Sequence, residues 1–326
     1  SGVLYTFFKE ESMMSAYYIN DDDCFVIGNY NHAKPFSSFL PAIAGLYGKP
    51  MWVYYVNRGQ CIASMGVDNK DHALMEFQPA NKAYRQTALQ GFRTFMKIAG
   101  TNGTVCYEPF QSSRREDILQ RMYVSAHDLT VEEINTALGI RTEIMYCTLP
   151  GETIAGLIRR VRVTNLSEER REIEILDGLP IVLPFFISDA LLKNESNLRQ
   201  AWINVDYCDT VPFYNVKVLP ADVAETVFVA GGNFYLNFDA GAGGGVRIAQ
   251  AVVDPILVFG SATDFSYPEG FYDGDFHIPA KQADVGLTPC GFGHRRVILA
   301  PGDTDTAYTL VGKADDYEGL TDFIGT

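Results

Sequence analysis

The sequence predicts an all-β fold, a large antiparallel β-super-sandwich with few short helices. Many short runs alternate apolar and polar residues; Val161 and Val163, for example, alternate with Arg160, Arg162 and Thr164. Such period-two alternation is typical of strands with one buried and one solvated face. Turn-forming residues, including 29 glycines and 15 prolines, separate these runs. Helical candidates are few, which completes the case for an all-β chain.

Turn signals lie between the strand-like runs. Pro150-Gly151 and Pro301-Gly302 each separate two such runs, and a Pro-Gly pair suits a type II turn. The run Asp21–Asp23 lacks the spaced ligands and the glycine of a calcium loop, so it predicts a turn between two strands. The glycine-rich stretch 241–245 has no dinucleotide or phosphate-loop pattern and predicts a loop or hairpin tip.

Three segments carry helical signals. Ser112 or Ser113 caps a predicted short turn that runs from Arg114 to Arg121. Thr130 and Glu133 fit a capping box, but we expect a strand over 131–137. The last segment, 314–324, has acidic residues at its start and predicts a helix.

Bulk composition excludes several classes of function. The chain has 326 residues and a formal net charge of −14, from 26 basic and 40 acidic side chains. An acidic chain argues against nucleic-acid and anionic-membrane partners. Its six cysteines contain no Cys-x-x-Cys pair, so neither zinc nor a disulfide framework is indicated, and a reducing, cytoplasmic location is expected. No apolar run is long enough to span a membrane, and no secretion signal opens the sequence.

The stretch 29–84 mixes aromatic strand residues with clusters of Asn, Arg, Lys, Gln and Asp. A sugar-binding site needs this mixture, because the C–H faces of a sugar pack on aromatic rings while its hydroxyl groups require hydrogen-bond donors and acceptors. An aromatic-rich sandwich with solvated loops is the plainer interpretation of the same pattern.

A family resemblance rests on blocks within this stretch and beyond it. The blocks are NYNHAKPFSSFLPAIAG, PMWVYYVNRGQ, NKDHALMEFQPANKAY, LPGETIAGLIRRVRVTNLSEERREIEILDGLP, VPFYNVKVLPADV and LAPGDTDTAYTLVGKADD. Together they resemble the amino-terminal region of the glycoside phosphorylases of glycoside hydrolase family 94, and most closely the 1,2-β-oligoglucan phosphorylases. The first two blocks are specific, whereas the later ones resemble many sugar-enzyme sandwiches.

The resemblance implies a domain organisation. Residues 1–312 would form the β-super-sandwich, and 313–326 would begin a helical linker toward an (α/α)6 barrel that this sequence lacks. The family's general acid and most of its phosphate ligands lie in that barrel. We therefore expect no catalytic residue here, no cofactor and no metal. The partners would be a β-1,2-glucooligosaccharide, inorganic phosphate and the barrel.

Binding residues are expected on loops that approach the barrel. Gly59 suits a hairpin turn, which would project its neighbours outward. The alternative is that these groups brace neighbouring loops by hydrogen bonds. The candidate substrate-binding residues are Asn57, Arg58, Gln60, Lys70, Asp71, Asn81 and Lys82.

Four functions remain open on the sequence. The first is a non-catalytic sandwich domain of a phosphorylase that releases α-glucose 1-phosphate. The others are a stand-alone carbohydrate-binding module, a hydrolase with two facing carboxylates, and a structural domain without ligand contacts. Glu76 is the local acid that stands out, because it lies between Met75 and Phe77. In an alternating strand it would face solvent while these two neighbours face inward.

Overall fold

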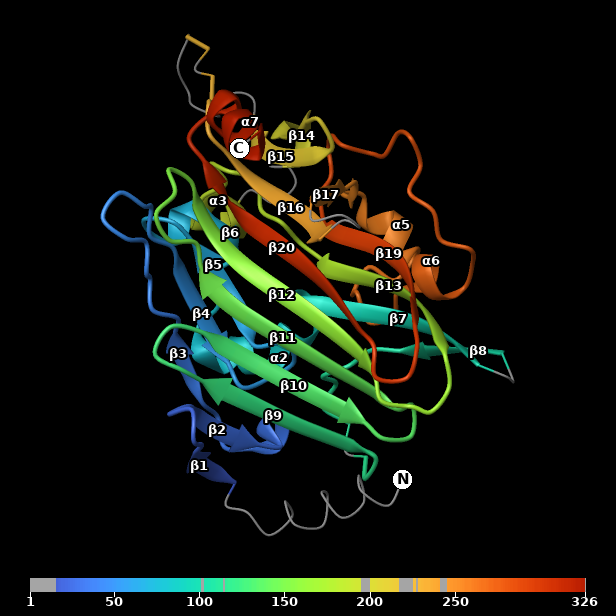
Figure 1. Cartoon of the computed structure of the whole chain (residues 1–326). Coiled ribbons are helices and arrows are strands. Elements are labelled where there is room, and N and C mark those ends of the chain that lie inside the picture. Colours follow the sequence, from blue (N-terminus) through green and yellow to red (C-terminus); the bar gives the residue numbers. More distant parts are fainter. Residues whose placement is uncertain are drawn as a thin grey trace.

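The computed structural model describes residues 16–100, 103–113, 115–194, 200–216, 225–226, 228–240 and 245–325. Within these residues the strands form three antiparallel sheets of eleven, five and four strands, with a few short helices (Figure 1). The all-β sandwich predicted from the alternation is confirmed. No helix in the described part combines the length and the apolar character that crossing a bilayer requires.

The largest sheet forms one layer of the sandwich. Its order is β1 (Tyr17–Ile19), β2 (Phe25–Gly28), β9 (Ile118–Val124), β10 (Leu129–Asn135), β11 (Ile140–Thr148), β12 (Ala155–Asn165), β20 (Thr304–Ala314), β16 (Gly232–Ala240), β15 (Val211–Val216) and β14 (Ile203–Cys208), with β17 (Val246–Ala249) paired to β16. Strand β11 alternates strictly between buried and partly exposed positions, and β12 does so after Leu157.

The two smaller sheets face this layer side by side. The five-stranded sheet has the order β18 (Ala251–Val252), β19 (Gly291–Leu299), β13 (Arg171–Leu179), β7 (Arg93–Gly100) and β8 (Gly103–Tyr107). The four-stranded sheet has the order β3 (Ser37–Phe39), β4 (Trp52–Val56), β5 (Ile62–Gly66) and β6 (Ala73–Met75). The main core joins apolar residues from all three sheets, among them Val53, Met96, Leu157 and Ile173. Burial between these layers is the principal stabilising contribution to the fold.

Short helices cover the outer faces of the sheets. Helix α2 (Ala80–Gln90) packs Ala83 on the four-stranded sheet. Helices α5 (Pro255–Phe259) and α6 (Glu269–Tyr272) pack against Phe95 and Phe292 of the five-stranded sheet. The remaining helical segments are α3 (Asp189–Asn194), α7 (Tyr317–Gly325), η1 (Tyr30–His32) and η2 (Lys70–His72).

Most local predictions agree with these elements. Gly151 and Gly302 adopt positive φ, as the Pro-Gly turns require. Gly151 lies between the paired strands β11 and β12, whereas Gly302 connects β19 of one sheet to β20 of another. The run Asp21–Asp23 forms the turn between β1 and β2, where Asn20 Oδ1 accepts a hydrogen bond from the Cys24 amide. The expected strand over 131–137 is present as β10. Most of the glycine-rich stretch, 241–244, lies outside the described residues.

Two helical predictions need correction. The turn expected through Arg121 is wrong, because β9 starts at Ile118 and pairs with β10 along its whole length. Cross-strand pairing there outweighs a local serine cap. The helix expected from Ala314 begins later, at Tyr317, since Ala314 still pairs with Gly232 as the last residue of β20.

Candidate functional site

The predicted binding turn 57–60 does connect β4 and β5, and Gly59 there has a φ of 54°. Its side chains, however, do not project outward together. Asn57 is fully buried; it accepts a hydrogen bond from the Phe36 amide at 2.8 Å and donates to the carbonyl groups of Tyr30 and Lys34 at 3.0 and 2.9 Å. The expected outward projection is wrong, because residues 30–36 cover the turn and need partners for their backbone groups.

The other two polar residues of this turn also contact protein. Gln60 is buried, donates to Thr94 Oγ1 at 3.0 Å and accepts from Arg159 at 2.6 Å. Arg58 is half-buried, donates to the Ala33 carbonyl at 3.2 Å and lies over the ring of Tyr84 at 5.6 Å. The bracing alternative thus accounts for their contacts, and ligand binding by these residues remains a prediction.

Lys70 and Asp71 lie on η2 and hold it against α3. Lys70 Nζ lies 3.0 Å from Asp189 Oδ2, and Asp71 Oδ1 accepts the Asp189 amide at 3.0 Å. A second lysine, Lys193, approaches the same carboxylate at 2.7 Å. Its hydrogen bond, with a further one from Lys70, lowers the pKa of Asp189 despite the burial that would raise it.

Asn81 and Lys82 occupy the first turn of α2, and both are exposed. Their exposure is compatible with ligand contact. Neither residue, though, lines the cleft between β6 and α5 that is described next. The sequence-predicted residues therefore lie on three elements: the turn 57–60, η2 and the first turn of α2.

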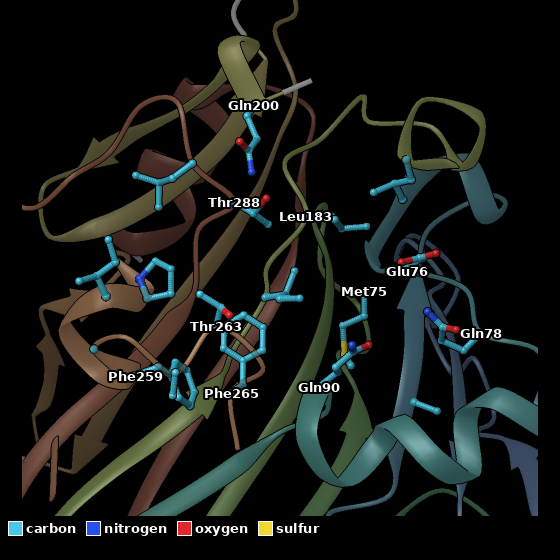
Figure 2. A pocket seen from close by; sticks show the side chains of 18 residues that line it. Met75, Glu76, Gln78, Gln90, Leu183, Gln200, Phe259, Thr263, Phe265 and Thr288 are labelled. Carbon is cyan, nitrogen blue, oxygen red and sulfur yellow. The ribbon is translucent and has the colours of Figure 1, made fainter. Parts of the chain in front are cut away.

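A cleft of about 450 Å³ is the best candidate site (Figure 2). It separates the edge formed by β5, β6 and α2 from the segment that begins with α5. Its volume lies in the range of small-molecule sites. The lining residues are Ala63, Met75, Glu76, Gln78, Gln90, Ile181, Leu183, Leu192, Gln200, Pro255, Ile256, Phe259, Gly260, Ala262, Thr263, Phe265, Leu287 and Thr288.

The two walls of the cleft differ in chemistry. Figure 2 shows Glu76, Gln78 and Gln90 on one side, and Phe259 and Phe265 on the other. The two phenylalanine rings have centroids 4.8 Å apart and an interplanar angle of 52°. The first side therefore adds amide and carboxyl groups to the apolar Met75, while the second combines aromatic carbon with the hydroxyl group of Thr263.

Glu76 supplies the acid of this cleft. Because β6 ends at Met75, the strand alternation does not continue, and Phe77 is 36% exposed instead of facing inward. Phe77 contacts Trp52 with ring centroids 6.1 Å apart. The expectation that Phe77 is buried is wrong for this reason. Among the described lining residues Glu76 alone carries a carboxyl group, so these residues supply one acid and not the carboxylate pair of a two-acid hydrolase.

No group of three or more histidine, cysteine or acidic side chains in the described residues is arranged to hold a metal ion. The cleft can instead bind a neutral, hydroxyl-rich molecule between a polar and an aromatic wall. Sequence reasoning did not single out its aromatic wall. The signal was present, since residues 259–276 also mix aromatic residues with turn-forming and polar ones.

No protein-family model matches the sequence, and no curated protein matches it. Solved structures match the chain distantly. A protein from Synechocystis sp. PCC 6803 shares 10% identity with a TM-score of 0.43, over 87% of this chain and 97% of that one. A putative aldose 1-epimerase from Escherichia coli K12 shares 12% identity with a TM-score of 0.34, over 86% and 99%.

Longer proteins match in the same way. A polysaccharide lyase shares 11% identity with a TM-score of 0.40, over 83% of this chain. A GH36 alpha-galactosidase from Geobacillus stearothermophilus shares 11% identity with a TM-score of 0.39, over 86% of this chain. This chain spans only 33% of the lyase and 41% of the galactosidase. Likeness at this level does not bear on function.

Proposed function

We propose that this chain is a carbohydrate-binding β-sandwich whose ligand occupies the cleft between Glu76 and Phe265. The observation that carries the proposal is that Glu76, Gln78 and Gln90 face the Phe259 and Phe265 rings across a cleft of about 450 Å³. A pyranose ring is amphipathic in the same way, with C–H faces that pack on aromatic carbon and hydroxyl groups that exchange hydrogen bonds.

At a finer level, we propose that the sandwich belongs to a glycoside phosphorylase that acts on β-1,2-glucooligosaccharides. The sequence blocks that resemble family 94 support this assignment. In the intact enzyme, phosphate would attack the anomeric carbon and a carboxylic acid would protonate the leaving oxygen, which releases α-glucose 1-phosphate. The acid would come from the barrel, and this chain would shape oligosaccharide subsites. Inorganic phosphate would be the co-substrate, without a further cofactor.

A structural domain without ligand contacts is the second candidate. It is favoured by the turn 57–60 and by Lys70, whose polar contacts all go to neighbouring protein groups. The two candidates differ in what they predict for the cleft, since a purely structural domain needs no affinity for sugar.

Calorimetric titration of the chain with β-1,2-glucooligosaccharides tests the proposal. We expect saturable binding, and we expect Phe265→Ala to raise Kd about tenfold, because stacking on an aromatic ring contributes roughly 1 kcal/mol or more. Tyr47→Ala is the matched control, since Tyr47 is 84% exposed and lies outside the cleft. Absence of binding, or equal losses in both variants, would contradict a sugar site here.

A second assay addresses catalysis. The chain is incubated with β-1,2-glucooligosaccharide and inorganic phosphate, and glucose 1-phosphate is measured. We expect none, because the acid is assigned to the barrel. Inverting phosphorolysis needs only one carboxylic acid, so release that is lost in Glu76→Gln would instead make Glu76 the catalytic acid.

A further inference from the structure

One phenylalanine of the cleft, Phe265, has an unusual backbone conformation. Phe265 has a φ of 60°, in the left-handed region that side chains other than Gly, Asn and Asp rarely adopt. Its amide donates to the Ala262 carbonyl at 3.0 Å, which closes a tight turn after α5. A large residue holds such a conformation only when its surroundings impose it, and this conformation directs the ring toward Phe259 and the cleft.

Arg93 contacts this turn from the five-stranded sheet. It lies on β7, is 1% exposed and donates from Nη1 to the carbonyl oxygen of Phe265. Its Nε and Nη2 donate to the two carboxylate oxygens of Glu108 at 2.7 and 2.8 Å. The guanidinium also lies over the ring of Phe95 at 4.6 Å and over that of Phe259 at 5.8 Å. One buried side chain thus contacts the backbone of one wall phenylalanine and the ring of the other.

Local contacts fix the two ends of the turn without Arg93. The backbone amide and hydroxyl of Ser261 both donate to Glu269 at 2.9 Å. Asp264 accepts from the Ser266 amide at 2.9 Å. These contacts all lie within residues 261–269. The hydrogen bond from Arg93, in contrast, connects the Phe265 carbonyl group to β7 of the five-stranded sheet.

We propose that Arg93 is a positioning residue that sets the aromatic wall of the cleft by holding Phe265 in its left-handed conformation. The inference rests on the proposed sugar site for its functional meaning, while its structural part can be measured independently. Glu108 fixes the orientation of the guanidinium, because a bidentate pair leaves the remaining Nη1 directed at Phe265.

The guanidinium geometry makes Arg93→Lys the informative substitution. A lysine keeps the positive charge near Glu108, but its ammonium group cannot donate a planar pair of bonds to the carboxylate and also reach the Phe265 carbonyl. We therefore expect the ion pair to survive in part while the turn is released. Arg121→Lys is the matched control, since Arg121 pairs with Glu132 at 2.9 Å on the large sheet, away from the cleft.

The experiment measures two quantities in the whole chain. The first is amide hydrogen exchange of the turn 261–266, and the second is Kd for β-1,2-glucooligosaccharide. In Arg93→Lys we expect faster exchange in the turn, unchanged exchange in β10 and β12, and a Kd raised about tenfold. In Arg121→Lys both quantities should match the wild type even where overall stability falls.

A double-variant arm separates positioning from general destabilisation. In a Phe265→Leu background, Arg93→Lys should change Kd far less than in the wild type, because the ring that it positions is gone. Equal effects in both backgrounds would overturn the proposal. Exchange of the turn that is unchanged by Arg93→Lys would overturn it as well, whether or not the wild type binds sugar. Failure of the wild type to bind, with faster exchange in the variant, would refute only the sugar site.

Discussion

At the residue scale, buried polar side chains in this protein satisfy backbone groups of distant loops. Asn57 is the clearest case, because its one amide group serves a backbone N–H and two backbone carbonyl groups in residues 30–36. The same residue type at position 81 lies exposed on α2. Two asparagines that the sequence marks as equivalent binding candidates therefore differ in their physical role.

Alanine substitutions at these two positions test this difference. Asn57→Ala removes the hydrogen bonds to one buried and two partly buried backbone groups, and we expect a loss of about 2–3 kcal/mol in the free energy of unfolding. Asn81→Ala should change stability little, because its side chain is solvated. Urea unfolding at neutral pH measures both. Equal losses in the two variants would show that the burial of Asn57 does not matter.

At the scale of elements, η2 and α3 are joined by a charge cluster around Asp189. Lys193 from α3 and Lys70 from η2 both approach its carboxylate. Hydrogen bonds from these lysines lower the pKa of Asp189, although its burial opposes the shift. Because α3 contributes Leu192 to the cleft, this junction also helps to place the cleft wall opposite α5.

The lowered pKa of Asp189 predicts a pH dependence of stability. The unfolded carboxyl group binds protons at a higher pH than the folded one, so its contribution is fully present above about pH 4. It is lost as the pH falls through the lower pKa of the folded state. Between about pH 5 and pH 2, we expect the free energy of unfolding to fall less in Asp189→Asn than in the wild type. Urea unfolding at a series of pH values measures both.

Lys193→Met is the matched variant for this prediction. It removes the first of the two hydrogen bonds, so its pH dependence should lie between those of the wild type and Asp189→Asn. If the free energy of unfolding depends on pH in the same way in all three proteins, the Asp189 carboxyl group does not contribute to the loss of stability in acid.

At the scale of the whole molecule, one buried ion pair joins the layers of the sandwich. Arg159 of β12 is fully buried, pairs with Asp177 of β13 and donates to Gln60 beside the four-stranded sheet. Thr94 of β7 donates to the same aspartate at 2.5 Å. The cluster touches all three sheets, so the relative position of the layers depends on it.

Removing one partner of this pair should be costly. Arg159→Met leaves the Asp177 carboxylate buried without its counter-charge, and we expect a loss of about 3–5 kcal/mol. The double variant Arg159→Met/Asp177→Leu should lose less, because no uncompensated charge remains. Thermal and urea unfolding measure both variants. Arg115→Met serves as control, since its ion pair with Asp117 is exposed and should leave stability unchanged.

Prediction from the sequence succeeded where the signal was local and failed where it was not. The alternation around Val161 in β12 and the turns at Gly151 and Gly302 agree with the structure, because these depend on neighbouring residues. The turn at Gly59 was also placed correctly. The direction of its side chains was not, since it depends on packing against residues 30–36, which no local pattern encodes.

By itself, the sequence determined the all-β fold class, the position of several strands and turns, and the acidic composition of the chain. Side-chain alternation and turn chemistry act over a few residues, so they can be read along the chain. Only the tertiary structure decided where a ligand could bind. The cleft brings Glu76 and Gln90 opposite Phe265, and Arg93 beneath it, across separations of more than 170 positions. Such contacts exist only after the layers have packed, because burial and distant hydrogen bonds create them.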